Sequence, residues 1–331
     1  MNVDTVRLSK NRTIIMGMAM ICVVLFHSSL DFSRFRLAQL VKQHGDIGVD
    51  IFLMMSGMGI YSSLEKMSSI KAYIQRRVRR IVPAYLLANG CWFFLVDLIL
   101  HTNGIEQFLL DVSSLSFWIN GRLTTWYLSS LLVLQLLTPK YLQIWRKVPD
   151  LNKISIVFAV IMPVCITYTP RLDASLGHLL IFFYRIPAYL AGLEIGKALN
   201  SEKSTVLVPK TVLVTSLGMS ILILVIINGS LPIYLRWALR YTAFLPIAVV
   251  LSCFFSRVPG NAVVSFFGTR SLEIYLLHEK VLWILSAINR HFSCGLKANG
   301  LLINMLSIGL CCIGAEILHR LAGMMISRKV V

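Results

Sequence analysis

Ionisable side chains lie inside long apolar stretches of this sequence. His27 stands in the run VVLFHSS, and four other runs contain Asp50, Arg185, Arg240 and His278. Such side chains are costly in a bilayer and usually face a protein interior or a water-filled cavity. A neutral imidazole near neutral pH can accept a proton or attack a carbonyl group. His27 is the first candidate for a catalytic residue because it has no ionisable partner nearby in the sequence.

These five residues are predicted to lie at a similar depth in a membrane. A helical rise of about 1.5 Å per residue places His27 and His278 roughly 20 and 18 Å above the inner edge of their helices. The same rise places Arg185 and Arg240 roughly 10 and 12 Å below the outer edge. In a hydrocarbon core about 30 Å thick these four share one level, with Asp50 just above them. We therefore expect a single buried site, although Asp50 and the arginines could equally be paired structural charges.

An arginine-rich segment, KAYIQRRVRRIVPAYLL, contains Arg76, Arg77, Arg79 and Arg80. The ordinary interpretation is a positively charged anchor at the cytoplasmic start of a membrane helix. Arginine also binds phosphate through two parallel hydrogen bonds and keeps its charge. The segment is therefore compatible with a polyphosphorylated cytoplasmic ligand and with an anionic lipid headgroup.

The composition predicts the kind of fold that carries these residues. Of the 331 residues, 56% are hydrophobic and only 14% are charged, which excludes a disordered chain and argues against a soluble enzyme. Runs of roughly 20 apolar residues predict an all-α integral membrane bundle of about ten transmembrane helices. The runs are Ile14–Leu30, Ile47–Leu64, Ile81–Leu100, Thr125–Pro139, Ile154–Tyr168, His178–Leu199, Thr211–Asn228, Ile233–Phe255, Val263–Ala287 and Gly300–Leu318.

The basic residues predict the orientation. With the N-terminus in the cytoplasm, the inner loops hold about three times as many Lys and Arg residues as the outer loops. Both termini are therefore expected in the cytoplasm, and the net charge of +17 does not call for a nucleic-acid partner. We expect one domain over residues 1–331 with an uncleaved first span and no appended soluble domain. Of the seven cysteines only Cys294 lies in a loop, and no Cys or His spacing indicates disulfides or a metal site.

Six motifs in this order resemble the membrane-bound acyltransferase 3 family, whose members O-acylate bacterial surface glycans. They are MGMAMICVVLFHSS, GDIGVDIFLMMSGMGI, IQRRVRRIVPAYLL, TWYLSSLLVLQLLTP, YRIPAYLAGLEIGK and FFGTRSLEIYLLHEKVL. Two positions depart from the family pattern. Met16 stands where an arginine usually precedes the first histidine, with Arg12 one turn earlier, and Glu279 follows His278 where proline is common.

The resemblance implies an O-acyltransferase in the bacterial cytoplasmic (inner) membrane. It implies acetyl-CoA as a cytoplasmic co-substrate, no permanently bound cofactor, and a sugar hydroxyl of a surface polysaccharide or its lipid-linked precursor as acceptor at the outer face. His27 would be either a general base or a covalent acceptor of the acetyl group. Arg185 would stabilise oxyanion charge or orient the acceptor, and Asp50 would orient an arginine or His27.

The remaining residues would bind the two substrates. The nucleotide end of CoA would be held by Arg76, Arg77, Arg79, Arg80 and Arg12, and the acceptor site would be lined by Trp126, Tyr127, Arg240, Tyr275 and His278. For Trp126 and Tyr127 the ordinary alternative is an aromatic belt at the membrane surface. A transporter or flippase is the rival function, although no internal symmetry typical of transporters is evident. A non-catalytic membrane scaffold does not explain charges on several helices at one depth.

Overall fold

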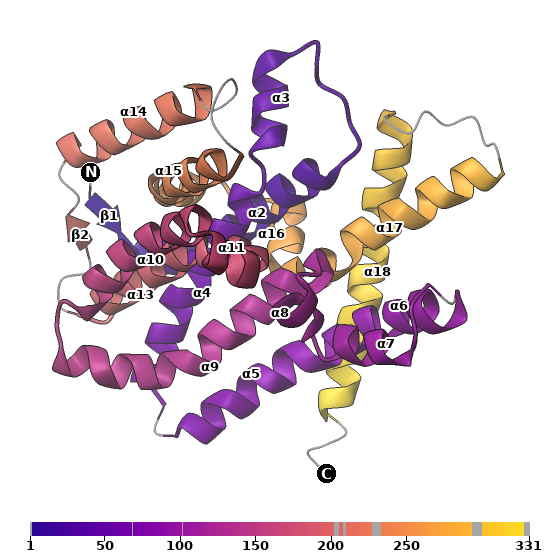
Figure 1. Cartoon of the computed structure of the whole chain (residues 1–331), viewed down its shortest axis with the longest axis horizontal. Helices are drawn as coiled ribbons and strands as arrows, with labels where there is room; N and C mark the ends of the chain where they lie inside the picture. The colour runs from indigo at the N-terminus through magenta and orange to yellow at the C-terminus, as the bar shows by residue number, and fades with distance from the viewer. Residues whose placement is uncertain are drawn as a thin grey trace. The chain divides into compact units, whose positions relative to one another are not determined.

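The computed structural model describes residues 2–67, 69–100, 102–201, 205–207, 210–226, 233–292 and 300–327. These residues are almost entirely helical, which confirms the predicted all-α class. Among them, β1 (Asn2–Asp4) and β2 (Thr205–Leu207) form an antiparallel pair with Val3 opposite Val206 (Figure 1). The sequence did not predict this pair because three-residue strands are too short to show a periodicity.

The described residues form two compact units. Unit 1 comprises Met1–Arg12, Val49–Ile74 and Ser113–Val258, and unit 2 comprises Thr13–Gly48, Gln75–Val112 and Pro259–Val331. Each unit therefore combines segments that are distant in the sequence. The expectation of one domain over residues 1–331 stays a prediction.

Unit 1 contains the β1–β2 pair and the helices of the central part of the chain. Its helices are α1 (Thr5–Lys10), most of α4 (Ile47–Glu65), α8 (Ser116–Asn120), the 3₁₀ turn η3 (Leu123–Thr125), α9 (Trp126–Lys147), α10 (Leu151–Tyr168), α11 (Pro170–Leu176), the 3₁₀ turn η4 (Gly177–Leu179), α12 (Leu180–Phe183), α13 (Ile186–Leu199), α14 (Lys210–Ile226) and α15 (Ile233–Phe255). Its core includes the contacts of α10 with α13 and of α14 with α15.

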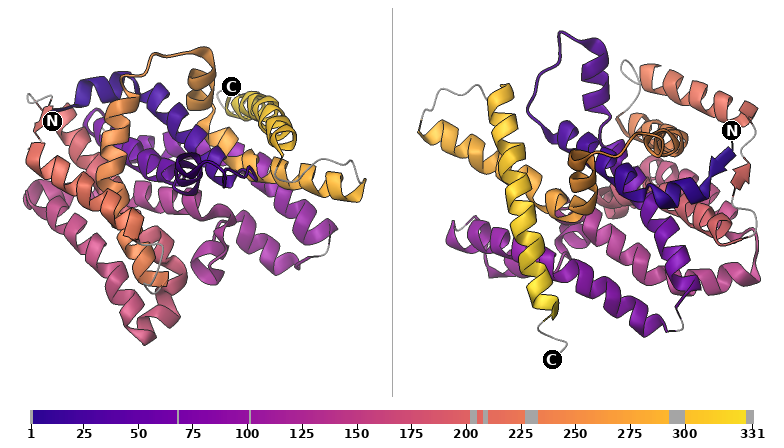
Figure 2. Two further views of the ribbon diagram at one scale, coloured as in Figure 1. Left: turned by 90° about the horizontal axis from the view of Figure 1, so that it is seen from above. Right: turned by 180° about the vertical axis from the view of Figure 1, so that it is seen from behind.

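Unit 2 contains the first long helix and the last helices of the described chain. Its elements are α2 (Arg12–His27), α3 (Arg36–Gln43), most of α5 (Ile70–Tyr85), the π-helix η1 (Leu86–Gly90), α6 (Cys91–Phe93), the π-helix η2 (Phe94–Ile99), α7 (Ile105–Val112), α16 (Ala262–Thr269), α17 (Ser271–His291) and α18 (Leu301–Ser327). The orange α17 and yellow α18 lie side by side (Figure 2).

Each of the ten predicted apolar runs overlaps a helix. Within the described residues, five helical stretches are long and apolar enough to cross a membrane: Ile47–Glu65, Ile70–Ile99, Leu151–Tyr168, Pro170–Leu199 and Leu301–Ile326. Two further apolar helices, Arg12–His27 and Leu239–Phe255, are shorter. Ten spans and cytoplasmic termini therefore stay predictions. Six cysteines are free thiols, and Cys294 lies outside the described residues.

One predicted run, His178–Leu199, is not a continuous helix. A turn at Tyr184 and Arg185 separates α12 from α13, and Arg185 is the N-cap residue of α13. Pro187 occupies the first turn of α13, where its missing N–H removes no helical hydrogen bond. The depth of Arg185 was inferred from a continuous helix and stays a prediction.

Close backbone contact between α2 and α16 depends on glycine. A Cβ atom at Gly17 would lie 2.0 Å from the Val264 carbonyl oxygen, and one at Gly268 would lie 2.0 Å from the Thr13 carbonyl oxygen. Any side chain at either position must push the two helices apart. Because α2 ends at His27 and α16 leads into α17, this contact helps to position the candidate site described below.

We expect Gly268→Ala to lower the yield of folded protein, since backbone atoms cannot move aside as a flexible side chain can. Gly309→Ala is the matched control, because a Cβ at this α18 position meets no atom within 4 Å. Fluorescence-detected size exclusion of the full chain in detergent measures both variants. Equal monodisperse peaks for the two variants would contradict this packing argument.

Candidate active site

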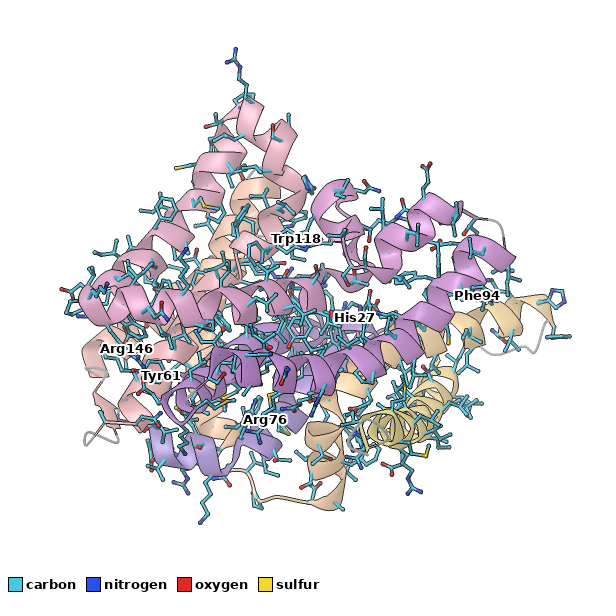
Figure 3. All side chains as sticks on the ribbon, turned by 90° about the horizontal axis from the view of Figure 1, so that it is seen from below. His27, Tyr61, Arg76, Phe94, Trp118 and Arg146 are labelled. Carbon is cyan, nitrogen blue, oxygen red and sulfur yellow. The ribbon has the colours of Figure 1, made fainter. Side chains whose placement is uncertain are left out.

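His27 lies at the C-terminal end of α2 and pairs with a residue of α17 (Figure 3). Its Nδ1 atom is 2.5 Å from Oε1 of Glu279, and 35% of its side chain is exposed. An ionised carboxylate only accepts hydrogen bonds, so Nδ1–H donates and Nε2 is left with its lone pair. The ring that the sequence singled out is thus held through Nδ1, which leaves Nε2 for other partners.

His278 lies beside this pair on the preceding residue of α17. Its ring centroid is 5.0 Å from that of His27, and only 7% of the residue is exposed. Its Nδ1–H donates to the carbonyl oxygens of Ile274 and Tyr275, at 3.2 and 2.9 Å. Its Nε2 atom is buried without a hydrogen-bond partner among the described residues. Tyr275, also predicted to line the site, has its ring 5.7 Å from that of His278.

A cavity adjoins the two histidines. It is small, with about 20 Å³ of space open to water-sized molecules, and is lined by residues of α2, α16, α17 and α18. Most of its wall is apolar, and its polar side chains include His27, His278, Asn304 and Ser307. The two histidines therefore border a small apolar space with a few convergent polar groups.

Asn304 of α18 holds the chain that follows His27. Its Oδ1 accepts the backbone N–H of Ser29 at 3.1 Å, and its Nδ2 donates to Ser29 Oγ at 3.0 Å and to the Gly300 carbonyl at 2.9 Å. Asn304 is 3% exposed. The end of α2 is therefore fixed to α18 by part-buried hydrogen bonds, which restrict the position of His27.

The four clustered arginines lie on α5, in unit 2 (Figure 3). Arg76, Arg79 and Arg80 are exposed and Arg77 is half-buried. At 100° per residue, Arg76, Arg79 and Arg80 lie within about one third of the helix circumference. They therefore form one cationic surface. None of the four lines the cavity beside His27.

A second group of predicted site residues lies in unit 1. Arg185 forms an ion pair with Asp50, and both residues are 2% exposed. The Arg185 guanidinium carbon is 4.5 Å from the ring centroid of Tyr241 and 5.7 Å from that of Trp126. The two paired charges are thus buried, and two half-buried aromatic rings lie against the guanidinium. This pairing favours the structural alternative for Asp50 and Arg185.

The other unit 1 residues lie around this cluster. The ring of Tyr127 is 6.1 Å from that of Trp126, and the Arg240 guanidinium is 5.9 Å from the ring of Tyr241. Arg12 lies against Gly59 of α4, with its guanidinium carbon 3.6 Å from the position that a Cβ of Gly59 would occupy. Arg185, Arg240 and Asp50 belong to unit 1 and His27 to unit 2, and the expectation that they form a single site stays a prediction.

Glu279 and Asn304 are the two site residues that the sequence analysis missed. The position of Glu279 did carry a signal, because it follows His278 where the resembled family often has proline. Asn304 carried none, since a single asparagine in an apolar helix is usually a local helix-capping or backbone-bonding residue. Both roles depend on contacts between distant segments.

Comparison with known proteins assigns the chain to a family. The sequence model of that family, described as an acyltransferase domain, matches residues 15–319. No curated protein and no solved structure matches the chain. The match spans nearly the whole chain and confirms the resemblance carried by the six motifs, and with the apolar helices it indicates a multi-pass membrane protein. The chain belongs to the acyltransferase 3 family and is an acyltransferase.

Proposed function

We propose that this protein transfers an acetyl group from cytoplasmic acetyl-CoA to a sugar hydroxyl at the outer face of the bacterial cytoplasmic membrane. The acceptor is a surface polysaccharide or its lipid-linked precursor. The observation that carries the proposal is the His27–Glu279 pair beside a largely apolar cavity, in a chain of the acyltransferase 3 family.

The arrangement of the pair suits general-base catalysis. Glu279 accepts the Nδ1–H of His27 at 2.5 Å, which orients the ring, so that the neutral ring carries its lone pair on Nε2. The carboxylate also stabilises the imidazolium that forms when Nε2 takes up a proton, as the aspartate does in Ser–His–Asp triads. The pair therefore supplies both the general base, His27, and the carboxylate that orients it, Glu279.

In the direct route, the sugar hydroxyl oxygen attacks the thioester carbonyl while its proton moves to His27 Nε2. Collapse of the tetrahedral intermediate breaks the C–S bond, and the imidazolium returns the proton to the departing thiolate, giving CoA and the O-acetyl sugar. In the covalent route, Nε2 attacks the thioester first, the C–S bond breaks and CoA leaves as the thiolate. The sugar hydroxyl then attacks the acetyl-imidazolium, the C–N bond breaks, and the hydroxyl proton goes to the thiolate. The same lone pair serves both routes.

The two substrates call for different surfaces. The exposed face of Arg76, Arg79 and Arg80 suits the phosphates of CoA, since guanidinium groups bind phosphate in a planar, two-point fashion. Arg77 and Arg12 belong to the same proposed donor site. For the acceptor we propose Trp126, Tyr127 and Arg240, because aromatic faces and charged donors recognise sugar rings and hydroxyls. Arg185 and Asp50 then hold the Trp126 ring in place.

The proposal is tested with the full chain in proteoliposomes. Labelled acetyl-CoA is supplied on one side, and glycan extracted from the producing cells is supplied on the other. Label in the glycan, identified by NMR as an O-acetyl ester, is the expected result. Movement of unmodified glycan across the membrane without label would instead support the flippase alternative.

Glu279→Gln should lower kcat with little change in either KM, because the amide cannot stabilise the imidazolium. We expect a loss of roughly tenfold to a hundredfold, below the loss of about 10⁴ seen for a buried triad aspartate. The smaller effect follows from the 52% exposure of the Glu279 side chain, which lets water replace part of its role.

Glu106→Gln is the control for this variant, because Glu106 is an exposed acidic residue of α7 in the same unit. Steady-state kinetics of label transfer measure both. If Glu279→Gln keeps the full kcat, Glu279 has no part in orienting His27.

A further inference from the structure

The residues around His27 also offer the ligands of a metal site. His27, His278 and Glu279 each present one ligand atom, and these atoms all lie within 4.8 Å of one another. Two imidazole nitrogens and one carboxylate oxygen form a common ligand set of zinc sites that keep an open fourth position. The cavity beside the histidines provides space for that fourth position.

The buried side chain of His278 points independently to a ligand. Metal-binding histidines usually donate their second ring N–H to a carbonyl or carboxylate, which directs the other nitrogen to the ion. His278 has this arrangement, since its Nδ1–H donates to the Ile274 and Tyr275 carbonyls. Its Nε2 is buried without a hydrogen-bond partner among the described residues, although buried polar atoms are almost always paired.

The helix pair α17–α18 contains a second His–Glu pair that lacks this feature. His319 Nδ1 lies 2.8 Å from Glu273 Oε1, but 46% of the His319 side chain is exposed, and neither residue belongs to the group of His27, His278 and Glu279. The Glu273–His319 pair therefore has no buried, unpaired imidazole beside it among the described residues. This makes the second pair a suitable control.

We propose that His27, His278 and Glu279 bind a divalent transition-metal ion, Zn²⁺ being the best fit, and that the bound ion inhibits acyl transfer. Zn²⁺ prefers imidazole and carboxylate ligands at about 2.0–2.2 Å in tetrahedral geometry. His27 Nδ1 and Glu279 Oε1 must then separate by roughly 1 Å from their present 2.5 Å. The side chains have room for this movement, because 35% of His27 and 52% of Glu279 are exposed.

The inhibitory half of this inference rests on the proposed function. When the ion binds, the proton on His27 Nδ1 moves through solvent to Nε2, and a metal–nitrogen bond forms at Nδ1. The one proton of the ring then lies on Nε2, so the ring can neither accept a proton from the acceptor hydroxyl nor attack the thioester. Removing the ion restores the free base.

The metal site is tested first without reference to activity. The full chain, purified in detergent and freed of metal with EDTA, is titrated with Co²⁺, whose visible absorption reports tetrahedral coordination. We expect saturation at one ion per chain and displacement by Zn²⁺. His278→Gln and Glu279→Gln should each weaken Co²⁺ binding by roughly tenfold or more, whereas His319→Gln should leave it unchanged.

Absence of a saturable Co²⁺ spectrum, or equal binding by the wild type and the two ligand variants, would overturn the site. Glu279→Gln keeps the test decisive if His278→Gln fails to fold, because Glu279 is half exposed. In the second arm, Zn²⁺ should abolish transfer of label to glycan, and EDTA should restore it. Binding that leaves transfer unchanged or increases it would overturn the inhibitory role. If the metal-free protein transfers no acetyl group, the proposed function fails, and the Co²⁺ titration still decides the metal site.

Discussion

Replacing His27 by alanine should lower glycan acetylation by at least a hundredfold while leaving the protein folded in the membrane. General acid–base catalysis by a positioned side chain contributes about 10² to 10⁴ in rate, and in the covalent route the loss is larger because the nucleophile is removed. His27 is the last residue of α2, and its ring contacts Glu279 and His278. The substitution removes these side-chain contacts and leaves the backbone hydrogen bonds of the helix in place. Label transfer from acetyl-CoA measures the effect.

His291→Ala is the matched control, because His291 is an exposed histidine at the end of α17 in the same unit. It should retain full transfer. The two routes can be separated in the wild type by omitting the acceptor: an acetyl group that stays on the purified chain and is lost in His27→Ala indicates the covalent route. Normal acetylation by His27→Ala would refute the assignment of His27.

Replacing Arg76 and Arg79 together by glutamine should raise the KM for acetyl-CoA by about a hundredfold with kcat nearly unchanged. Hydrogen bonds to charged groups contribute about 1.5–3 kcal/mol each, so the loss of two phosphate contacts is enough to weaken acetyl-CoA binding by about a hundredfold. Both side chains are exposed on one face of α5, so glutamine at these positions should not disturb the helix. Initial rates across a range of acetyl-CoA concentrations measure the effect.

Lys71→Gln on the same helix is the control for loss of charge, since Lys71 is exposed and lies more than one turn before the cluster. It should leave the donor KM unchanged. The Arg76→Lys, Arg79→Lys variant keeps the charge but loses the planar donors, and should give an intermediate KM. An unchanged KM in the glutamine variant would show that the cluster binds anionic lipid instead of the donor.

The helices were largely predictable from the sequence, because hydrophobic runs are a local property of the chain. Each of the ten runs overlaps a helix. The turn at Arg185 is consistent with Pro187, since proline is favoured in the first turn of a helix, where α13 begins. The family was likewise carried by ordered motifs and is confirmed over residues 15–319. That the ionisable residues share one site stays a prediction, because it rests on depth alone, and depth says nothing about which helices are neighbours.

The sequence by itself determined a helical, membrane-type chain of the acyltransferase 3 family with an unusual histidine at the end of its first long helix. Only the tertiary structure decided what that histidine faces. Glu279 and Asn304 reach it and its neighbour Ser29 from α17 and α18, and Arg185 is neutralised by Asp50 from α4. The physical reason is that a buried polar group must find a partner across helices, and helix packing, which depends on close contacts such as those of Gly17 and Gly268, decides which partners come within reach.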